Sequence, residues 1–238
     1  MTYAKSLVAS LAGAIASLTL FSCAALAQLD ETWVSGAGSG SICQRTAPCL
    51  SFVTAYNTTN AGGAISVLDG GNFGGFNITK SLTVRANGAV GGATQTSSHG
   101  YWINVTVAPS DTVVLDGLNL VGGGIVIAGA GTVVIRNCRI GFNNDAGVSN
   151  TLVFGIRIAP TGPLQVVVSD TAVENNGNAS GGAGIHVIPQ PGGSARVMLE
   201  RVTVSRNQFG VAVDGSQSTA GINLTIKDST LSANVNDG

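Results

Sequence analysis

The sequence predicts an all-β protein built as a single-stranded parallel β-helix, and three observations support this prediction. One stretch of sequence returns four times along the chain. Apolar residues recur at alternate positions inside each copy. The composition includes 34 Gly among 238 residues, with 44% hydrophobic and only 10% charged residues. Many short strands joined by Gly-rich turns account for this composition better than a helical bundle or a disordered chain does.

The four copies of the repeated stretch begin at Val133, Val166, Val197 and Leu224. Each copy closes with an asparagine, and these residues are Asn143, Asn176, Asn207 and Asn234. Apolar residues at every second position are the signal of a strand with one buried face. After three of the asparagines comes a second apolar motif, such as Gly184-Ile185-His186-Val187. Each repeat therefore carries about three short strands.

A repeat of this kind cannot bury its own apolar face and must stack on the next repeat. Stacking produces parallel, in-register strands about 4.8 Å apart, with like residues above like residues. The stacked asparagines then hydrogen-bond to one another and to the main chain at the turn. We therefore expect about five to seven coils, held at one turn by an asparagine ladder.

The first 27 residues are predicted to be a secretory signal peptide. Lys5 supplies its positive charge, an apolar stretch follows, and Ala25 and Ala27 form a small-x-small cleavage site. The mature chain is then expected to begin at Gln28 and to be exported, either to the periplasm or to the cell surface and medium. No other segment approaches the roughly 20 apolar residues of a transmembrane helix, so we expect no membrane span.

Three cysteines remain after the predicted cleavage site. Cys43 and Cys49 are close in sequence, and export permits a disulfide between them that stabilises the fold by about 2 kcal/mol. Cys138 aligns with inward residues of the repeat and is predicted to be a buried, inert thiol. Neither His nor further Cys accompanies the close pair, so we predict no metal site and no cofactor.

Four parts of the mature chain carry a resemblance to known proteins. They are TWVSGAG from Thr32, CQRTAPCLSFVTA from Cys43, GGAISVLDGGNFGGFNITKSLTV from Gly62 and the asparagine-ending copies. These stretches are similar to the right-handed parallel β-helix proteins of the pectin-lyase-like superfamily, and in particular to small secreted bacterial β-helix-repeat proteins. The resemblance implies right-handed coils. It implies little chemistry, because members of that group are mostly of undetermined function.

The resemblance also implies that a short helix caps the N-terminal end of the coil stack. The stretch PCLSFVTAYNTT is expected to form this helix, with Pro48 in its first turn. Leu50, Val53 and Tyr56 would then lie on one face of the helix, which would cover the open end of the first coil.

These expectations divide the mature chain into two parts of a single domain. Residues 28–62 would form the cap segment with its disulfide, and residues 63–238 would form the coils. Gly238 stands where a further strand would begin, so the last coil is expected to be incomplete. Two explanations are open: the chain is truncated there, or a partner covers the exposed strand edge.

Alignment of the repeats predicts columns of charged side chains. Asp170, Arg201 and Asp228 fall in one column and alternate in sign, which would help to fix the register of the coils. The two carboxylates are two coils apart, about 9–10 Å, which is near the upper limit for an inverting glycosidase pair. Arg201 between them would keep both ionised, and this argues against general-acid catalysis.

Arg157 and His186 occupy the outward position of the second apolar motif in successive coils. A β-eliminating polysaccharide lyase needs a base of this kind beside acidic residues that bind Ca²⁺. No group of carboxylates accompanies Arg157 and His186 in the sequence. The alternative interpretation is that both are solvated surface residues.

Two further features are candidate ligand-binding surfaces. His99, Tyr101 and Trp102 combine aromatic rings with a polar side chain, which can stack on a sugar, although Trp102 could instead pack under a loop. A column of apolar residues is also predicted to point outward as a stripe, either covered by a loop or open to a partner. The stripe consists of Val114, Val134, Val167 and Met198.

Two classes of function follow from these observations. The first is a secreted or surface-associated scaffold without catalysis, which presents a rigid face to a polysaccharide or a protein. The second is a lyase or hydrolase that acts on an acidic polysaccharide, with Ca²⁺ required only in the lyase case. The lack of a converging acidic cluster favours the first. A net charge of −1 and no basic stripe argue against nucleic acid as a partner.

Overall fold

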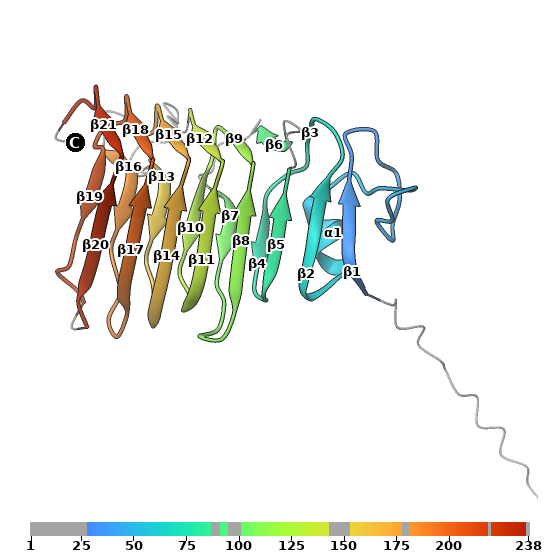
Figure 1. Ribbon diagram of the computed structural model, residues 1–238, viewed down its shortest axis with the longest axis horizontal. Coiled ribbons are helices and arrows are strands. Elements are labelled where there is room, and N and C mark those ends of the chain that lie inside the picture. The colour runs from blue at the N-terminus through green and yellow to red at the C-terminus, as the bar shows by residue number, and fades with distance from the viewer. Residues whose placement is uncertain are drawn as a thin grey trace, which may run out of the picture.

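The computed structural model describes residues 28–86, 91–94, 101–142, 153–177, 181–218 and 220–236, and for 91–94, 101 and 102 it describes the main chain only. The predicted signal peptide, His99 and Asn143 therefore lie outside the described residues. Figure 1 shows the strands standing side by side in successive coils along the long axis of the molecule.

Among the described residues, 21 strands form three sheets in which strands of successive coils pair in parallel. The eight-stranded sheet contains β1 (Leu29–Val34), β2 (Thr59–Val67), β5 (Leu82–Arg85), β8 (Thr112–Asp116), β11 (Gly131–Arg136), β14 (Pro163–Ser169), β17 (Ser194–Glu200) and β20 (Ile222–Lys227). The six-stranded sheet contains β4 (Phe76–Ile78), β7 (Tyr101–Val105), β10 (Gly124–Ile127), β13 (Val153–Ile158), β16 (Gly182–Val187) and β19 (Val211–Val213). The seven-stranded sheet contains β3 (Gly71–Asn72), β6 (Gly91–Thr94), β9 (Asn119–Val121), β12 (Arg139–Gly141), β15 (Ala172–Glu174), β18 (Thr203–Ser205) and β21 (Thr230–Ser232).

The register of the strands follows the alignment of the sequence repeats. Val133 of β11 pairs with Val166 of β14, which pairs with Val197 of β17 and then with Leu224 of β20. Each coil contributes one strand to each sheet, so the chain forms a parallel β-solenoid of about six turns. The all-β parallel β-helix predicted from the repeats is confirmed.

The space between the three sheets is filled by the inward residues of each coil. Ile135, Ile140 and Ile156 come from three different sheets and are all fully buried. Cys138 is also buried, and its Sγ lies 3.1 Å from the main-chain oxygen of Arg136. Burial raises the pKa of this thiol to about 12, so it stays protonated and inert.

The described part of the asparagine ladder runs through three coils. The main-chain N–H and the side-chain Nδ2 of Asn176 both donate to Oδ1 of Asn207, at 3.0 and 2.9 Å. The same two groups of Asn207 donate to Oδ1 of Asn234, at 3.0 and 3.2 Å. Asn176 and Asn207 are buried, so these bonds satisfy amides that water cannot reach.

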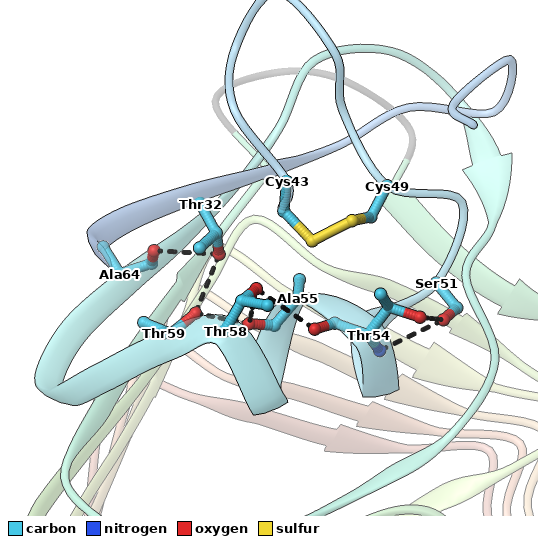
Figure 2. Close-up of a disulfide and its surroundings, with 9 residues drawn as sticks. All are labelled: Thr32, Cys43, Cys49, Ser51, Thr54, Ala55, Thr58, Thr59 and Ala64. Carbon is cyan, nitrogen blue, oxygen red and sulfur yellow. Dashed lines mark hydrogen bonds between the residues drawn. A yellow bond between two sulfur atoms is a disulfide. The ribbon is translucent and has the colours of Figure 1, made fainter. Parts of the chain in front are cut away.

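The N-terminal end of the solenoid is closed by β1, by the helix α1 (Phe52–Thr58) and by a disulfide between Cys43 and Cys49 (Figure 2). Ser51 caps the helix, because its Oγ accepts a hydrogen bond from the main-chain N–H of Thr54 at 3.2 Å. The predicted disulfide and the predicted short helix are both present.

The predicted orientation of that helix is wrong for Leu50 and Val53, whereas Tyr56 is partly buried and packs against the core as predicted. Leu50 and Val53 are 53% and 46% exposed, and Pro48 lies before the helix rather than in its first turn. The buried face instead carries Phe52, whose ring lies 5.2 Å from that of Phe73 and 5.3 Å from that of Phe76, between centroids. Aromatic packing against the first coils therefore decides which face turns inward.

The opposite end of the solenoid buries its inward residues less completely. Ile222 and Leu224 of β20 are half-buried, and Ile226 is 43% exposed. Within the described ranges, no helix is long and apolar enough to span a membrane.

Candidate functional site

The outer face of the eight-stranded sheet carries three parallel columns of side chains, fixed by the strand register. The groove column consists of Thr132, Gln165, Arg196 and Asn223. The apolar stripe consists of Val114, Val134, Val167 and Met198, all half-buried. The charged column consists of Asp116, Arg136, Ser169, Glu200 and Lys227. The predicted stripe therefore lies between a polar edge and a charged edge of the same sheet.

A groove of about 530 Å³ follows the groove column across the coils, at the side where the strands of this sheet begin. Its floor and rim are formed by main chain and small residues together with the column itself. They include Pro109, Gly131, Pro163, Leu164, Ser194, Ala195, Ala220, Gly221 and Ile222. Gly131 has φ +91°, and a Cβ there would lie 2.6 Å from the main-chain oxygen of Ala108, so the groove needs glycine at this position.

The charged side chains of the charged column form ion pairs with one another. Arg136 contacts Asp116 at 2.9 Å, and Lys227 contacts Glu200 at the same distance. Hydrogen bonds from Lys227, together with the charge of Arg201, hold the pKa of Glu200 below its usual range. These pairs link one coil to the next, which suits a role in register.

The groove column differs from the charged column, because its cation, Arg196, has no partner among the described residues. Within the part of the chain that the structure describes, the guanidinium of Arg196 makes no ion pair and no side-chain hydrogen bond. The residue is exposed, so the guanidinium is open to a ligand. No Asp or Glu of the described ranges lines the groove. Gln165, Asn223 and Thr132 add amide and hydroxyl groups on either side of Arg196. The groove is therefore a positively charged surface with several free hydrogen-bonding groups.

One member of the candidate acid pair, Asp170, is held in its ionised state. Arg201 donates to both carboxylate oxygens of Asp170, at 2.7 and 2.9 Å. These bonds hold the pKa of Asp170 below its usual range, so it cannot serve as a proton donor near neutral pH. Asp228 lies two coils beyond Asp170, 3.7 Å from the ammonium of Lys227.

Both carboxylates of this pair sit at a turn, and the main-chain conformation accounts for their residue types. Asp170, Arg201 and Asp228 have φ of 49°, 53° and 49°, as Asn137 and Gly117 do in earlier coils with 54° and 73°. Asp, Asn and Gly tolerate this left-handed conformation better than other residues do. The column therefore reflects the geometry of the turn as well as charge pairing.

Arg157 and His186 are neighbours in register on the outer face of the six-stranded sheet. His186 is half-buried rather than solvated, since its ring stacks on that of Phe154 with centroids 4.6 Å apart. Its Nδ1 is buried and has no hydrogen-bond partner. Burial and the charge of Arg157 lower the pKa of His186, and Asp214 opposes them weakly, so the imidazole is neutral at neutral pH.

The remaining candidates lie at the edge of what the structure describes. Tyr101 and Trp102 begin β7, and Trp102 immediately precedes Ile103, the residue that pairs with Phe76 of β4. Over the ranges given above, no group of three or more His, Cys, Asp or Glu side chains is arranged to hold a metal ion.

Sequence reasoning missed the groove column. The alignment that identified the apolar stripe also places Thr132, Gln165, Arg196 and Asn223 in one column, two positions earlier. What the sequence could not show is that Arg196 lacks a partner while Arg136 and Lys227 have one. That difference depends on where the turns place the neighbouring carboxylates.

The comparisons with known proteins add no relative: no protein-family model matches the chain, and no curated protein and no solved structure is detectably similar to it.

Proposed function

We propose that this protein is an exported, non-catalytic scaffold that holds an acidic polysaccharide along the outer face of its eight-stranded sheet. The observation that carries the proposal is the groove, in which the unpaired guanidinium of Arg196 stands in a column of amide and hydroxyl side chains with no carboxylate. An arginine binds a carboxylate or a sulfate through two parallel hydrogen bonds.

The solenoid suits a polymeric ligand better than a small molecule. The groove crosses successive coils, so an extended chain of repeating units would meet a polar side chain at each step of about 4.8 Å. The main chain of the column is already fixed by strand pairing, so little backbone freedom is lost when a ligand binds. Rigid, repeated contacts of this kind favour an extended ligand.

Export and handedness belong to the same proposal. The predicted signal peptide, and a Cys43–Cys49 disulfide of the kind that persists in oxidising compartments, support export to the periplasm or beyond. The resemblance of the sequence to pectin-lyase-like proteins supports a right-handed coil. The parallel solenoid is consistent with that assignment.

The test compares one variant in the groove with one outside it. Affinity electrophoresis would measure retention of the protein in gels that contain polygalacturonate, alginate, arabinoxylan or starch. We expect retention by an acidic polymer, and a loss of about tenfold or more in affinity for Arg196→Gln. Arg45→Gln is the matched control, because it removes the same charge from an exposed arginine in the loop closed by the disulfide.

The outcomes separate the alternatives. Equal retention of Arg196→Gln and Arg45→Gln would mean that the polymer binds outside the groove or that binding depends only on net charge. No retention by polygalacturonate or by alginate would contradict the proposal itself.

A lyase is the second candidate, and the pairing of Arg157 with a neutral His186 is the observation that favours it. The same samples would be assayed for new reducing ends and for unsaturated-uronate absorbance, with and without Ca²⁺. Turnover that is lost in Arg157→Ala or His186→Ala would replace the non-catalytic proposal with this one.

A further inference from the structure

A second cavity lies at the N-terminal end of the solenoid, away from the groove. This cap pocket has a volume of about 490 Å³ and lies between α1 and the outer face of the six-stranded sheet. Val53, Tyr56 and Asn57 line it from the helix, Phe76 and Asn77 from β4, and Asn104 from β7. It lies on a different sheet from Arg196, so it is independent of the function proposed above.

The polar lining of the cap pocket consists of three side-chain amides with unused hydrogen-bonding capacity. Nδ2 of Asn104 donates to Oδ1 of Asn77 at 2.9 Å, which fixes both side chains. Nδ2 of Asn77 and Oδ1 of Asn104 then have no partner among the described residues, and neither has the side chain of Asn57. The pocket thus offers a free donor beside a free acceptor on adjacent strands, with a third amide opposite.

The rest of the lining is apolar and rigid. Val53 is 46% exposed, on the side of the helix that does not pack on the core. The hydroxyl of Tyr56 bonds to Oγ1 of Thr79 at 2.9 Å and accepts from the main-chain N–H of Thr79 at 3.0 Å. The ammonium of Lys80 lies 4.4 Å from the centre of the Tyr56 ring and holds it in place.

Among the residues that the structure describes, no charged side chain lines the cap pocket. The ammonium of Lys80, which lies over the ring of Tyr56, donates to the main-chain oxygens of Tyr56 and Thr59. A charged ligand would therefore find no counter-charge in the lining. Amides, in contrast, match hydroxyl groups, because both donate and accept hydrogen bonds.

We propose that the cap pocket binds a neutral saccharide. The free amide groups of Asn57, Asn77 and Asn104 bond to its hydroxyls, and Val53 and Tyr56 contact the apolar face of the ring. This assignment gives the outward-facing side chain of Val53 a function. The valine contacts the ligand, while Phe52 on the other face of the helix contacts the core. The protein then has two saccharide sites of different chemistry, a neutral one at its capped end and a charged one along the eight-stranded sheet.

Isothermal titration calorimetry on the full mature chain tests this site. The probes are cellotriose, xylotriose, mannotriose and chitotriose, with trigalacturonate as the charged counterpart. We expect at least one neutral trisaccharide to bind, and to bind more tightly than trigalacturonate at this site. In the double variant Asn77→Val, Asn104→Val the affinity should fall about tenfold or more, since two hydrogen-bonding amides are removed.

Asn223→Val is the matched control, because it removes an outward strand amide from the groove instead of from the cap pocket. It should leave neutral trisaccharide binding unchanged, and the double variant should leave retention by acidic polymers unchanged. Valine suits strand positions, and circular dichroism would verify that both variants keep the fold of the parent protein.

The proposal is overturned if none of the four neutral trisaccharides binds at millimolar concentration, or if the double variant binds as the parent does. It is equally overturned if Asn223→Val weakens neutral binding as much as the double variant does. None of these results touches the acidic polysaccharide proposal, which stands or falls with Arg196.

Discussion

The middle of the solenoid and its C-terminal end bury the same column of inward residues to different extents. Ile135 of β11 and Ile226 of β20 belong to one column of the eight-stranded sheet. Ile135 is fully buried, because coils lie on both sides of it, whereas Ile226 is 43% exposed. At the opposite end of the sheet, β1, α1 and the Cys43–Cys49 disulfide cover the first coil.

This contrast shows that the sequence pattern within a coil does not by itself set the contribution of a residue to stability. The pattern decides which side chains point inward. The neighbouring coils decide how much apolar surface is removed from water, as expected for a solenoid whose stability is a sum of interfaces between neighbours. Identical residue types at the two positions therefore allow a direct test.

Substitution of the buried isoleucine should have the largest effect. Ile135→Ala removes three buried carbons and leaves a cavity, so the free energy of unfolding should fall by about 3–4 kcal/mol. Ile226→Ala should cost about 1 kcal/mol, because the side chain is already partly in water. Urea denaturation followed by circular dichroism measures both values. Equal costs would show that Ile226 is covered in solution.

The asparagine ladder provides a second comparison, with a smaller expected effect. Asn207→Ala removes the acceptor for the main-chain N–H and Nδ2 of Asn176. The Nδ2 keeps its bond to the main-chain oxygen of Glu174, but the buried main-chain N–H is left unpaired, at a cost of about 2–3 kcal/mol. Asn234 makes the same bonds one coil later but is half-buried, so water can replace it and Asn234→Ala should cost about 1 kcal/mol. The same denaturation series decides this, and an Asn234 variant as damaging as the Asn207 variant would contradict the role of burial.

The parts of the fold that repeat could be predicted from the sequence, and the parts that occur once could not. The register of Val133, Val166 and Val197 can be read from the sequence, because the same pattern recurs in each copy and the copies can be aligned. The helix α1 has no second copy. Its seven residues offer Phe52 on one face and Val53 on the other, and periodicity over so short a segment cannot choose between them. Packing against the rings of Phe73 and Phe76, which lie outside the helix, determines that Phe52 faces inward.

The candidate sites were harder to predict for a related reason. The alignment placed Arg157 beside His186, and the structure has them in register. It could not foresee that Phe154 covers the imidazole, nor that Arg196 is left without an ion pair. The cap pocket joins a helix to two strands of different coils, and no repeat pattern describes such a junction.

Removal of the disulfide should have a local effect at the closed end. Its ring is short, so Cys43→Ser with Cys49→Ser should lower the free energy of unfolding by about 2 kcal/mol or less. The main-chain N–H groups of Trp33 and Ser35 donate to the oxygens of Cys43 and Cys49. Hydrogen exchange of these two amides should therefore accelerate, while exchange in β17 stays unchanged. Faster exchange in both regions would mean that the clip stabilises the whole solenoid.

Acid should have the smallest effect, and it acts through the exposed pairs that link coils. The bonds from Arg201 lower the pKa of Asp170 in the folded protein, so the unfolded chain binds the proton more readily. The stabilisation by this pair is therefore complete above the ordinary pKa of an aspartate and is lost as the pH falls through the lower pKa of the folded state. Asp170→Asn should flatten that part of the dependence of stability on pH, between about pH 4 and the folded pKa, and leave stability at pH 7 only slightly reduced. Arg196→Gln, which breaks no ion pair that the structure describes, is the control. A variant Asp170→Asn with an unchanged acid profile would show that the pair forms too weakly in solution to contribute to register.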